Sequence, residues 1–197
     1  YQGTQIKNTK VNSPKFYSAT KSDSYPTEVA RNLYITKSYT DSIYKFIKKA
    51  TLTENQEYLY SDLGYYLFKE ALENSYKKPL NKLVEEFFYQ SLGADRMTYL
   101  PLEKFDKSQI VPTEKDDYYR NQLVHGYVHD MGAAMLGGVG GHAGLFSNAN
   151  DVAKIMQMYL QKGYYGGKQL LNSETVDKFN KRYFANKKVR RGLGFDK

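Results

Sequence analysis

The residues best suited to chemistry are Tyr60 and Asp62, in a Tyr-Ser-Asp run that directly precedes an apolar stretch. From Leu63 to Asn74 the apolar side chains recur at helical spacing, which predicts a helix that begins just after Asp62. A phenol and a carboxylate would then stand at the mouth of that helix, where a site can use them and a core usually avoids them. The structural alternative is that Asp62 only caps the helix.

The Tyr60–Asp62 run resembles the Tyr-x-Asn element of the β-lactamase and DD-peptidase superfamily of penicillin-recognising serine enzymes. The resemblance implies that Tyr60, as a phenolate, takes the proton of a catalytic serine. An ordinary phenol has a pKa near ~10, so this role needs cationic neighbours. Asp62 departs from the family, because a carboxylate cannot donate a hydrogen bond to a substrate carbonyl. It could instead hold a lysine ammonium, which puts β-lactam recognition in doubt and leaves ester or peptide substrates open.

A glycine-rich segment makes the resemblance more specific. Residues 126–130 and 137–147, followed by a predicted helix from Asn150, look like the segment that follows Tyr-x-Asn in class C-like serine hydrolases. They are similar to the bacterial branch that, in some members, follows a glycoside hydrolase family 3 module on one polypeptide. Within this segment His142 and Gly144 are predicted to line the cleft. The alternative for His142 is a loop histidine that faces water.

The family's nucleophile, a Ser-x-x-Lys that opens an apolar helix, has no good match here. Residues 18–21 match the Ser-x-x-Lys pattern in residue type, but the polar run that follows, up to Pro26, cannot form a buried central helix. Residues 75–78 follow the tyrosine and are in the wrong order. Residues 142–144 imitate the closing Lys/His-Thr-Gly strand, but they precede a helix. We therefore expect the serine and the sheet to lie outside this chain, and the chain as given to be inactive.

The pattern of helices sets the expected fold. Helices are predicted over 39–50 and 63–74, and from Pro79 to a stop at Gly93. Two more follow, one capped by Ser147 or Asn148 and the last capped by Asn172 or Ser173. We expect a mainly α structure: the helical portion of a β-lactamase/DD-peptidase-like α+β fold, with long irregular connections and little sheet.

The expected domain organisation is a single domain. Residues 1–37 are predicted to form an irregular polar segment packed on the domain, and residues 38–197 its helical part. Residues 94–124 are expected to form a long connection. Both ends resemble the middle of something larger, so we expect truncation at each end.

Composition excludes several classes of site. The chain has no cysteine, which removes disulfides and thiolate chemistry. Its three histidines show no His-Glu-x-x-His pattern, so we expect no metal, and His129 with Asp130 is predicted to fix its loop by hydrogen bonds. The glycine run does not match a dinucleotide fingerprint, and no cofactor is expected.

Charge and composition also limit the partners. The net charge is +8, but the chain shows no nucleic-acid-binding motif, so a solvated basic surface is the simpler interpretation. No apolar run is long enough to span a bilayer. The expected partners are a small-molecule, peptide or cell-wall-derived substrate and the remainder of the chain's own catalytic domain. The resemblance implies a bacterial periplasm or cell-envelope protein.

Three functions stay open at this point. The first is part of a serine hydrolase that uses Tyr60 in acyl transfer. The second is a non-catalytic module on the same fold that binds cell-wall or glycan ligands through its tyrosines, of which there are 20. The third, weaker, is a basic surface protein that binds acidic polymers.

Overall fold

The computed structural model describes residues 1–51, 58–187 and 189–196. The chain divides into two compact units that interleave along the sequence. The first unit comprises Tyr1–Glu54, Ser61–Asn81 and Thr98–Phe146, and the second comprises Asn55–Tyr60, Lys82–Met97 and Ser147–Lys197. Within the described residues no helix is both long and apolar enough to cross a membrane.

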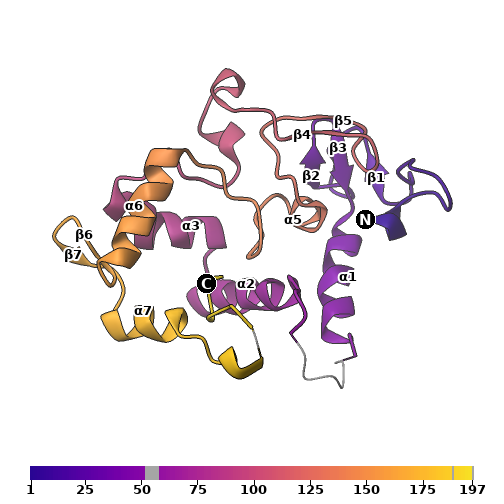
Figure 1. Ribbon diagram of the computed structural model, residues 1–197. Coiled ribbons are helices and arrows are strands. Elements are labelled where there is room, and N and C mark those ends of the chain that lie inside the picture. The colour runs from indigo at the N-terminus through magenta and orange to yellow at the C-terminus, as the bar shows by residue number, and fades with distance from the viewer. Residues whose placement is uncertain (52–57, 188, 197) are drawn as a thin grey trace. The chain divides into compact units, whose positions relative to one another are not determined.

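A small antiparallel sheet opens the first unit. It contains β1 (Tyr17–Ser18), β2 (Thr27–Ala30) and β3 (Leu33–Ile35), in the order β1-β3-β2 (Figure 1). The sequence predicts irregular structure over residues 1–37, so this sheet corrects that expectation. Strands of two to four residues are too short to show an alternating pattern. Strands β2 and β3 form a tight hairpin, whereas β1 pairs with β3 across a longer stretch of chain.

The helices of the first unit agree with the sequence. Helix α1 (Lys37–Lys48) and helix α2 (Leu63–Tyr76) lie within two residues of their predicted bounds. The short helix α5 (Met131–Met135) was not predicted. The described residues of this unit also form the 3₁₀ turns η1 (Gln2–Thr4), η3 (Pro101–Glu103) and η4 (Lys107–Gln109).

The expected long connection contains a hairpin. Strand β4 (Glu114–Asp116) pairs with β5 (Gln122–Val124), and Figure 1 shows the hairpin beside the small sheet. A hydrogen bond from Gln122 Nε2 to the carbonyl of Arg31 joins it to the loop between β2 and β3. The core of the first unit draws on the sheet, the hairpin and α5: Tyr17, Val29, Ile35, Tyr119, Val128, Ala133, Ala134 and Met135.

The described residues of the second unit form helices and a hairpin, and its first helix, α3, begins at the end of a segment of the first unit. Helix α3 (Leu80–Val84) continues into the π-helical turn η2 (Glu85–Tyr89) and α4 (Gln90–Leu92). Gly93, at φ +60°, ends this helix as predicted.

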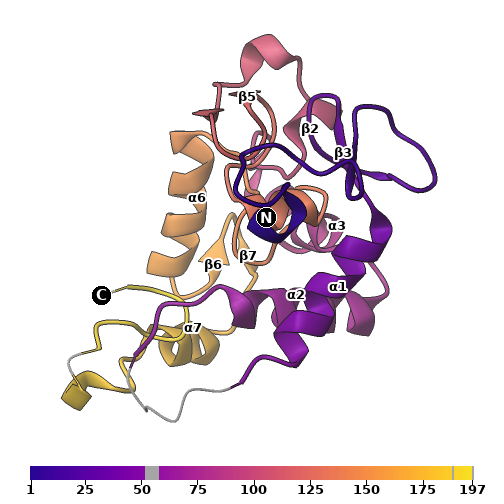
Figure 2. The ribbon, with the colours of Figure 1, turned by 90° about the vertical axis from the view of Figure 1, so that its right-hand side faces the viewer.

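The rest of the second unit follows in order: α6 (Ala149–Leu160), β6 (Tyr164–Tyr165), β7 (Lys168–Gln169), α7 (Ser173–Asn180) and the 3₁₀ turn η5 (Ala185–Lys187). Figure 2 shows the β6–β7 hairpin beside α6. Its core is Tyr89, Leu92, Ala94, Met97 and Met158.

Candidate functional site

Tyr60 lies outside the hydrophobic cores. Its side chain is 65% exposed, and Ser61 and Asp62 separate it in sequence from Leu63, the first residue of α2. Within the second unit, the guanidinium carbon of Arg191 lies 5.1 Å from the centre of the Tyr60 ring, a cation–π contact. The structure thus places a guanidinium against the exposed ring of Tyr60, and the role of Tyr60 in proton transfer stays a prediction.

Asp62 occupies the N-cap position of α2, but its carboxylate makes no capping hydrogen bond. Ser61 Oγ instead accepts a hydrogen bond from the N–H of Leu63, at 3.2 Å. Among the residues that the structure describes, Asp62 forms no ion pair. The cap interpretation thus does not account for its carboxylate, which stays available to a ligand or an ammonium group.

His142 does not face water. Its side chain is 3% exposed, and its ring stacks on Tyr66 of α2 with 4.3 Å between ring centres and 15° between planes. Its Nε2 donates to Asp130 Oδ1 at 2.8 Å. The alternative of a solvent-facing histidine is wrong, because a tyrosine and an aspartate enclose the imidazole. That His142 lines a cleft stays a prediction.

The surroundings of His142 shift two pKa values. Burial, with the charges of Asp130 and Asp62, raises the pKa of Tyr66 to about 12, so this phenol is neutral. The hydrogen bond from His142 outweighs burial and lowers the pKa of Asp130. Asp130 also caps α5 by accepting the N–H of Ala133 at 2.7 Å. The cluster therefore carries one carboxylate beside a neutral phenol.

Gly144 is required by the backbone. Its φ is +116°, a region that side-chain-bearing residues rarely adopt, and a Cβ there would meet the carbonyl oxygen of Gly138. The Tyr99 ring also closes on this position, and Tyr99 Oη donates to the carbonyl of Gly140 at 3.0 Å. Its glycine is thus explained by packing, and its predicted place in a cleft is not tested by this geometry.

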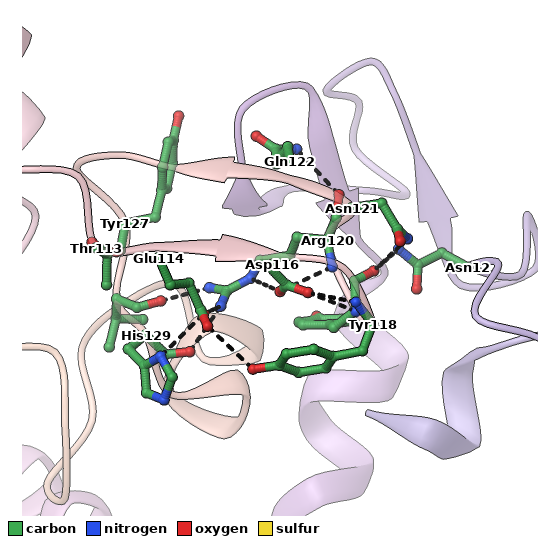
Figure 3. Close-up of polar contacts among 12 residues, drawn as sticks. Asn12, Thr113, Glu114, Asp116, Tyr118, Arg120, Asn121, Gln122, Tyr127 and His129 are labelled. Atoms are coloured by element: carbon green, nitrogen blue, oxygen red, sulfur yellow. Dashed lines mark hydrogen bonds and ion pairs between the residues drawn. The ribbon is translucent and has the colours of Figure 1, made fainter.

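The prediction that His129 and Asp130 fix their loop by hydrogen bonds is confirmed. The main donor is Arg120, whose side chain is fully buried and whose Nη2 donates to the carbonyl of His129 at 2.8 Å (Figure 3). Its Nη1 donates to the carbonyl of Val128. Together with the cap made by Asp130, these bonds hold the chain that leads into α5.

The same guanidinium forms a buried ionic network that the sequence did not predict. Arg120 Nε lies 2.8 Å from Asp116 Oδ2, and Nη2 pairs with Glu114 (Figure 3). Burial would raise the pKa of Asp116, but the hydrogen bond from Arg120 and three backbone N–H groups lower it. The sequence showed only a polar loop. The one usable signal was an arginine directly after two tyrosines.

A cavity of about 560 Å³ lies in the first unit and was also missed. Its polar lining includes Lys21, Glu28 and Tyr127, and Tyr127 Oη donates to Glu28 at 3.0 Å. Burial first, then this hydrogen bond, raises the pKa of Tyr127. His142 and Gly144 are not among the described residues that line it.

The structure also describes the other segments that the sequence analysis considered. Ser18 ends strand β1, opens no helix, and donates its hydroxyl to the carbonyl of Thr20 at 2.9 Å. Residues 142–144 form no strand. No group of three or more histidine, cysteine or acidic side chains within the described ranges could hold a metal ion.

Comparison with known proteins decides the family. Residues 15–196 match the family described as Beta-lactamase. The chain belongs to the β-lactamase family. This confirms the family-level resemblance drawn from Tyr60–Asp62 and the glycine-rich segment. The relation to the branch fused to glycoside hydrolase family 3 modules stays a prediction.

Relatives of this β-lactamase-family chain carry a peptidase name. A protein of Escherichia coli (strain K12) named "Putative D-alanyl-D-alanine carboxypeptidase" is 41% identical over 135 residues, 62% of this chain and 31% of that protein. A protein of Salmonella agona (strain SL483) with the same name is 33% identical over 172 residues, 80% of this chain and 40% of that protein. The chain thus spans about a third of the length of these relatives.

The fold of this β-lactamase-family chain has a solved counterpart. The octameric penicillin-binding protein homologue from Pyrococcus abyssi covers 73% of the chain with a TM-score of 0.50 at 18% identity, and the match takes up 30% of that chain. At this identity the likeness concerns the fold alone. The predicted fold class, the mainly helical portion of a β-lactamase-like fold, is confirmed.

Proposed function

We propose that this chain is the helical part of a serine hydrolase that cleaves peptides by acyl transfer, through a serine that this chain does not supply. The observation that carries the proposal is Tyr60, an exposed phenol at the start of α2 in a chain of the β-lactamase family. The relatives' name points to D-alanyl-D-alanine peptides as substrates. Such peptides belong to the bacterial cell wall, so we place the protein in the periplasm or cell envelope.

In the proposed reaction the serine oxygen attacks the peptide carbonyl, and Tyr60 as phenolate takes the proton of the serine hydroxyl. Tyr60 then returns the proton to the leaving amine, and water releases the acyl group from the serine. The guanidinium of Arg191 packs against the exposed Tyr60 ring, with its carbon 5.1 Å from the ring centre. Asp62 holds a lysine ammonium and so keeps that lysine charged near the serine.

The test compares two neighbouring tyrosines in the longer protein that this function requires. Tyr60→Phe should lower turnover of a D-alanyl-D-alanine peptide by about 10²–10⁴-fold, because the hydroxyl that moves the proton is gone. Tyr58→Phe is the matched control, since Tyr58 is also exposed (53%) and lies two residues upstream. Equal turnover in the two variants would remove Tyr60 from the mechanism.

A second comparison tests the substrate class. Asp62→Asn restores an amide, which can donate a hydrogen bond to a substrate carbonyl where the carboxylate cannot. The variant should be acylated by a fluorescent penicillin faster than the wild type. If the wild type instead binds the peptide without hydrolysing it, the non-catalytic binding module becomes the better account.

A further inference from the structure

His142 connects three parts of the first unit. It lies in the glycine loop, defined here as residues 137–144, and its ring stacks on Tyr66 in the first turns of α2. Its Nε2 reaches Asp130 at the start of α5. A single buried side chain thus ties the loop to both helices.

Two glycines beside this contact leave no space for a side chain of their own. A Cβ at Gly141 would collide with the carbonyl oxygen of Tyr65, and a Cβ at Gly132 would collide with the hydroxyl of Tyr66. The glycine loop and α5 therefore touch α2 directly at its first two turns. A displacement by the width of one methyl group would break these contacts.

The contact lies one turn from the candidate site. Asp62 and Tyr66 are four residues apart, so they share a face of the helix that begins at Leu63. A tilt or rotation of α2 at Tyr66 would therefore also move Asp62, which stands at the N-cap of the helix. The position of α2 therefore links His142 to Asp62 within the first unit.

Packing alone does not explain a histidine at this place. Among the described residues, His142 Nδ1 is buried and has no hydrogen-bond partner, which is unusual for a buried polar atom. An apolar side chain would fill the same space without leaving a nitrogen unpaired. The histidine combines a flat ring that stacks on Tyr66 with an N–H that reaches Asp130.

We propose that His142 is a positioning residue: by stacking on Tyr66 and bonding to Asp130 it fixes the start of α2, and through it Asp62, for acyl transfer. The proposal rests on the function proposed above. His142 itself makes no contact with substrate in this scheme and acts through the helix.

The test uses the longer, active protein with two matched histidine variants. His142→Gln keeps an N–H donor but loses the ring, and His129→Gln makes the same change at a neighbouring histidine whose side chain is 68% exposed. We expect His142→Gln to lower kcat by about 10²-fold, as a misplacement of 1 Å can, with little change in KM. His129→Gln should leave kcat unchanged. Circular dichroism confirms that each variant is folded.

A second pair of variants separates stacking from side-chain polarity. Tyr66→Phe keeps the ring and should retain wild-type kcat, whereas Tyr66→Leu should reproduce the loss in His142→Gln. Amide hydrogen exchange over Leu63–Tyr76, measured in all four variants, should rise by about tenfold in His142→Gln and Tyr66→Leu only. A folded His142→Gln variant with wild-type kcat and exchange would overturn the proposal. A wild type without hydrolysis refutes the proposed function instead, and the exchange data then decide the role of His142 alone.

Discussion

At the residue scale the most informative side chain is Arg120. Its guanidinium is fully buried and is paired with Asp116 and Glu114, while two backbone carbonyls take further N–H groups. Removing one partner of such a pair leaves a buried charge without compensation, which costs more than the pair itself contributes. The network therefore makes the hairpin and the loop before α5 depend on one residue.

Arg120→Met should destabilise the protein by about 3–5 kcal/mol, because Asp116 would remain buried without its cation. The control is Arg31→Met, at an exposed arginine in the loop after β2, which should change stability by less than about 0.5 kcal/mol. Urea unfolding followed by circular dichroism measures both. Equal losses would show that the buried network is not a stabilising feature.

At the element scale the caps can be compared directly. Asn148 caps α6 with its side chain, which accepts the N–H of Asp151 at 2.8 Å. Asn172 stands at the same position of α7 but makes no side-chain cap hydrogen bond. The two helices thus begin with the same residue type and differ in whether the cap is formed.

Asn148→Ala should cost about 0.5–2 kcal/mol, because an N–H at the start of α6 loses its acceptor. Asn172→Ala is the matched control and should cost clearly less. Thermal unfolding of the two variants gives the comparison. A larger loss at Asn172 would contradict the assignment of caps.

The elements also show what the sequence could predict. Helices α1, α2, α6 and α7 carry apolar residues at helical spacing or a recognisable cap, so local patterns were enough. The sheet of β1, β2 and β3 was missed because strands this short carry no such pattern. The pairing of β1 with β3 also depends on residues that are distant along the chain, such as Tyr17 and Ile35.

The sequence also identified some residues of the candidate site and missed others. Tyr60 and Asp62 could be picked out because they stand next to a predicted helix and match a family element. The partners of His142 could not be picked out from the sequence. Asp130 is 12 positions away, and Tyr66, whose ring stacks on His142, lies in α2. Only folding brings such groups together, and a histidine in a glycine-rich stretch gives no local sign of burial.

At the scale of the whole molecule, buried carboxylates link the fold to pH. Asp116, Asp130 and Asp151 all have pKa values below the usual range for aspartate. For Asp151, burial opposes the shift, and hydrogen bonds from Lys154 and the N–H of Arg96 outweigh it. These carboxylates lie in both units, so the effect of acid is not confined to one.

A carboxylate with a depressed pKa stabilises the folded state above its unfolded pKa, near ~3.9, and this contribution is lost as pH falls through the folded value. The contribution of these three aspartates to the free energy of unfolding should therefore be constant between about pH 7 and pH 5. It should fall steadily below about pH 4. Urea midpoints across this range measure it. Asp130→Asn should flatten the acid part of the curve, because one of the linked carboxylates is gone, whereas Asp41→Asn, at an exposed aspartate, should leave the shape unchanged. A wild-type midpoint that stays constant down to about pH 3 would show that these aspartates are not held in their charged form by the fold.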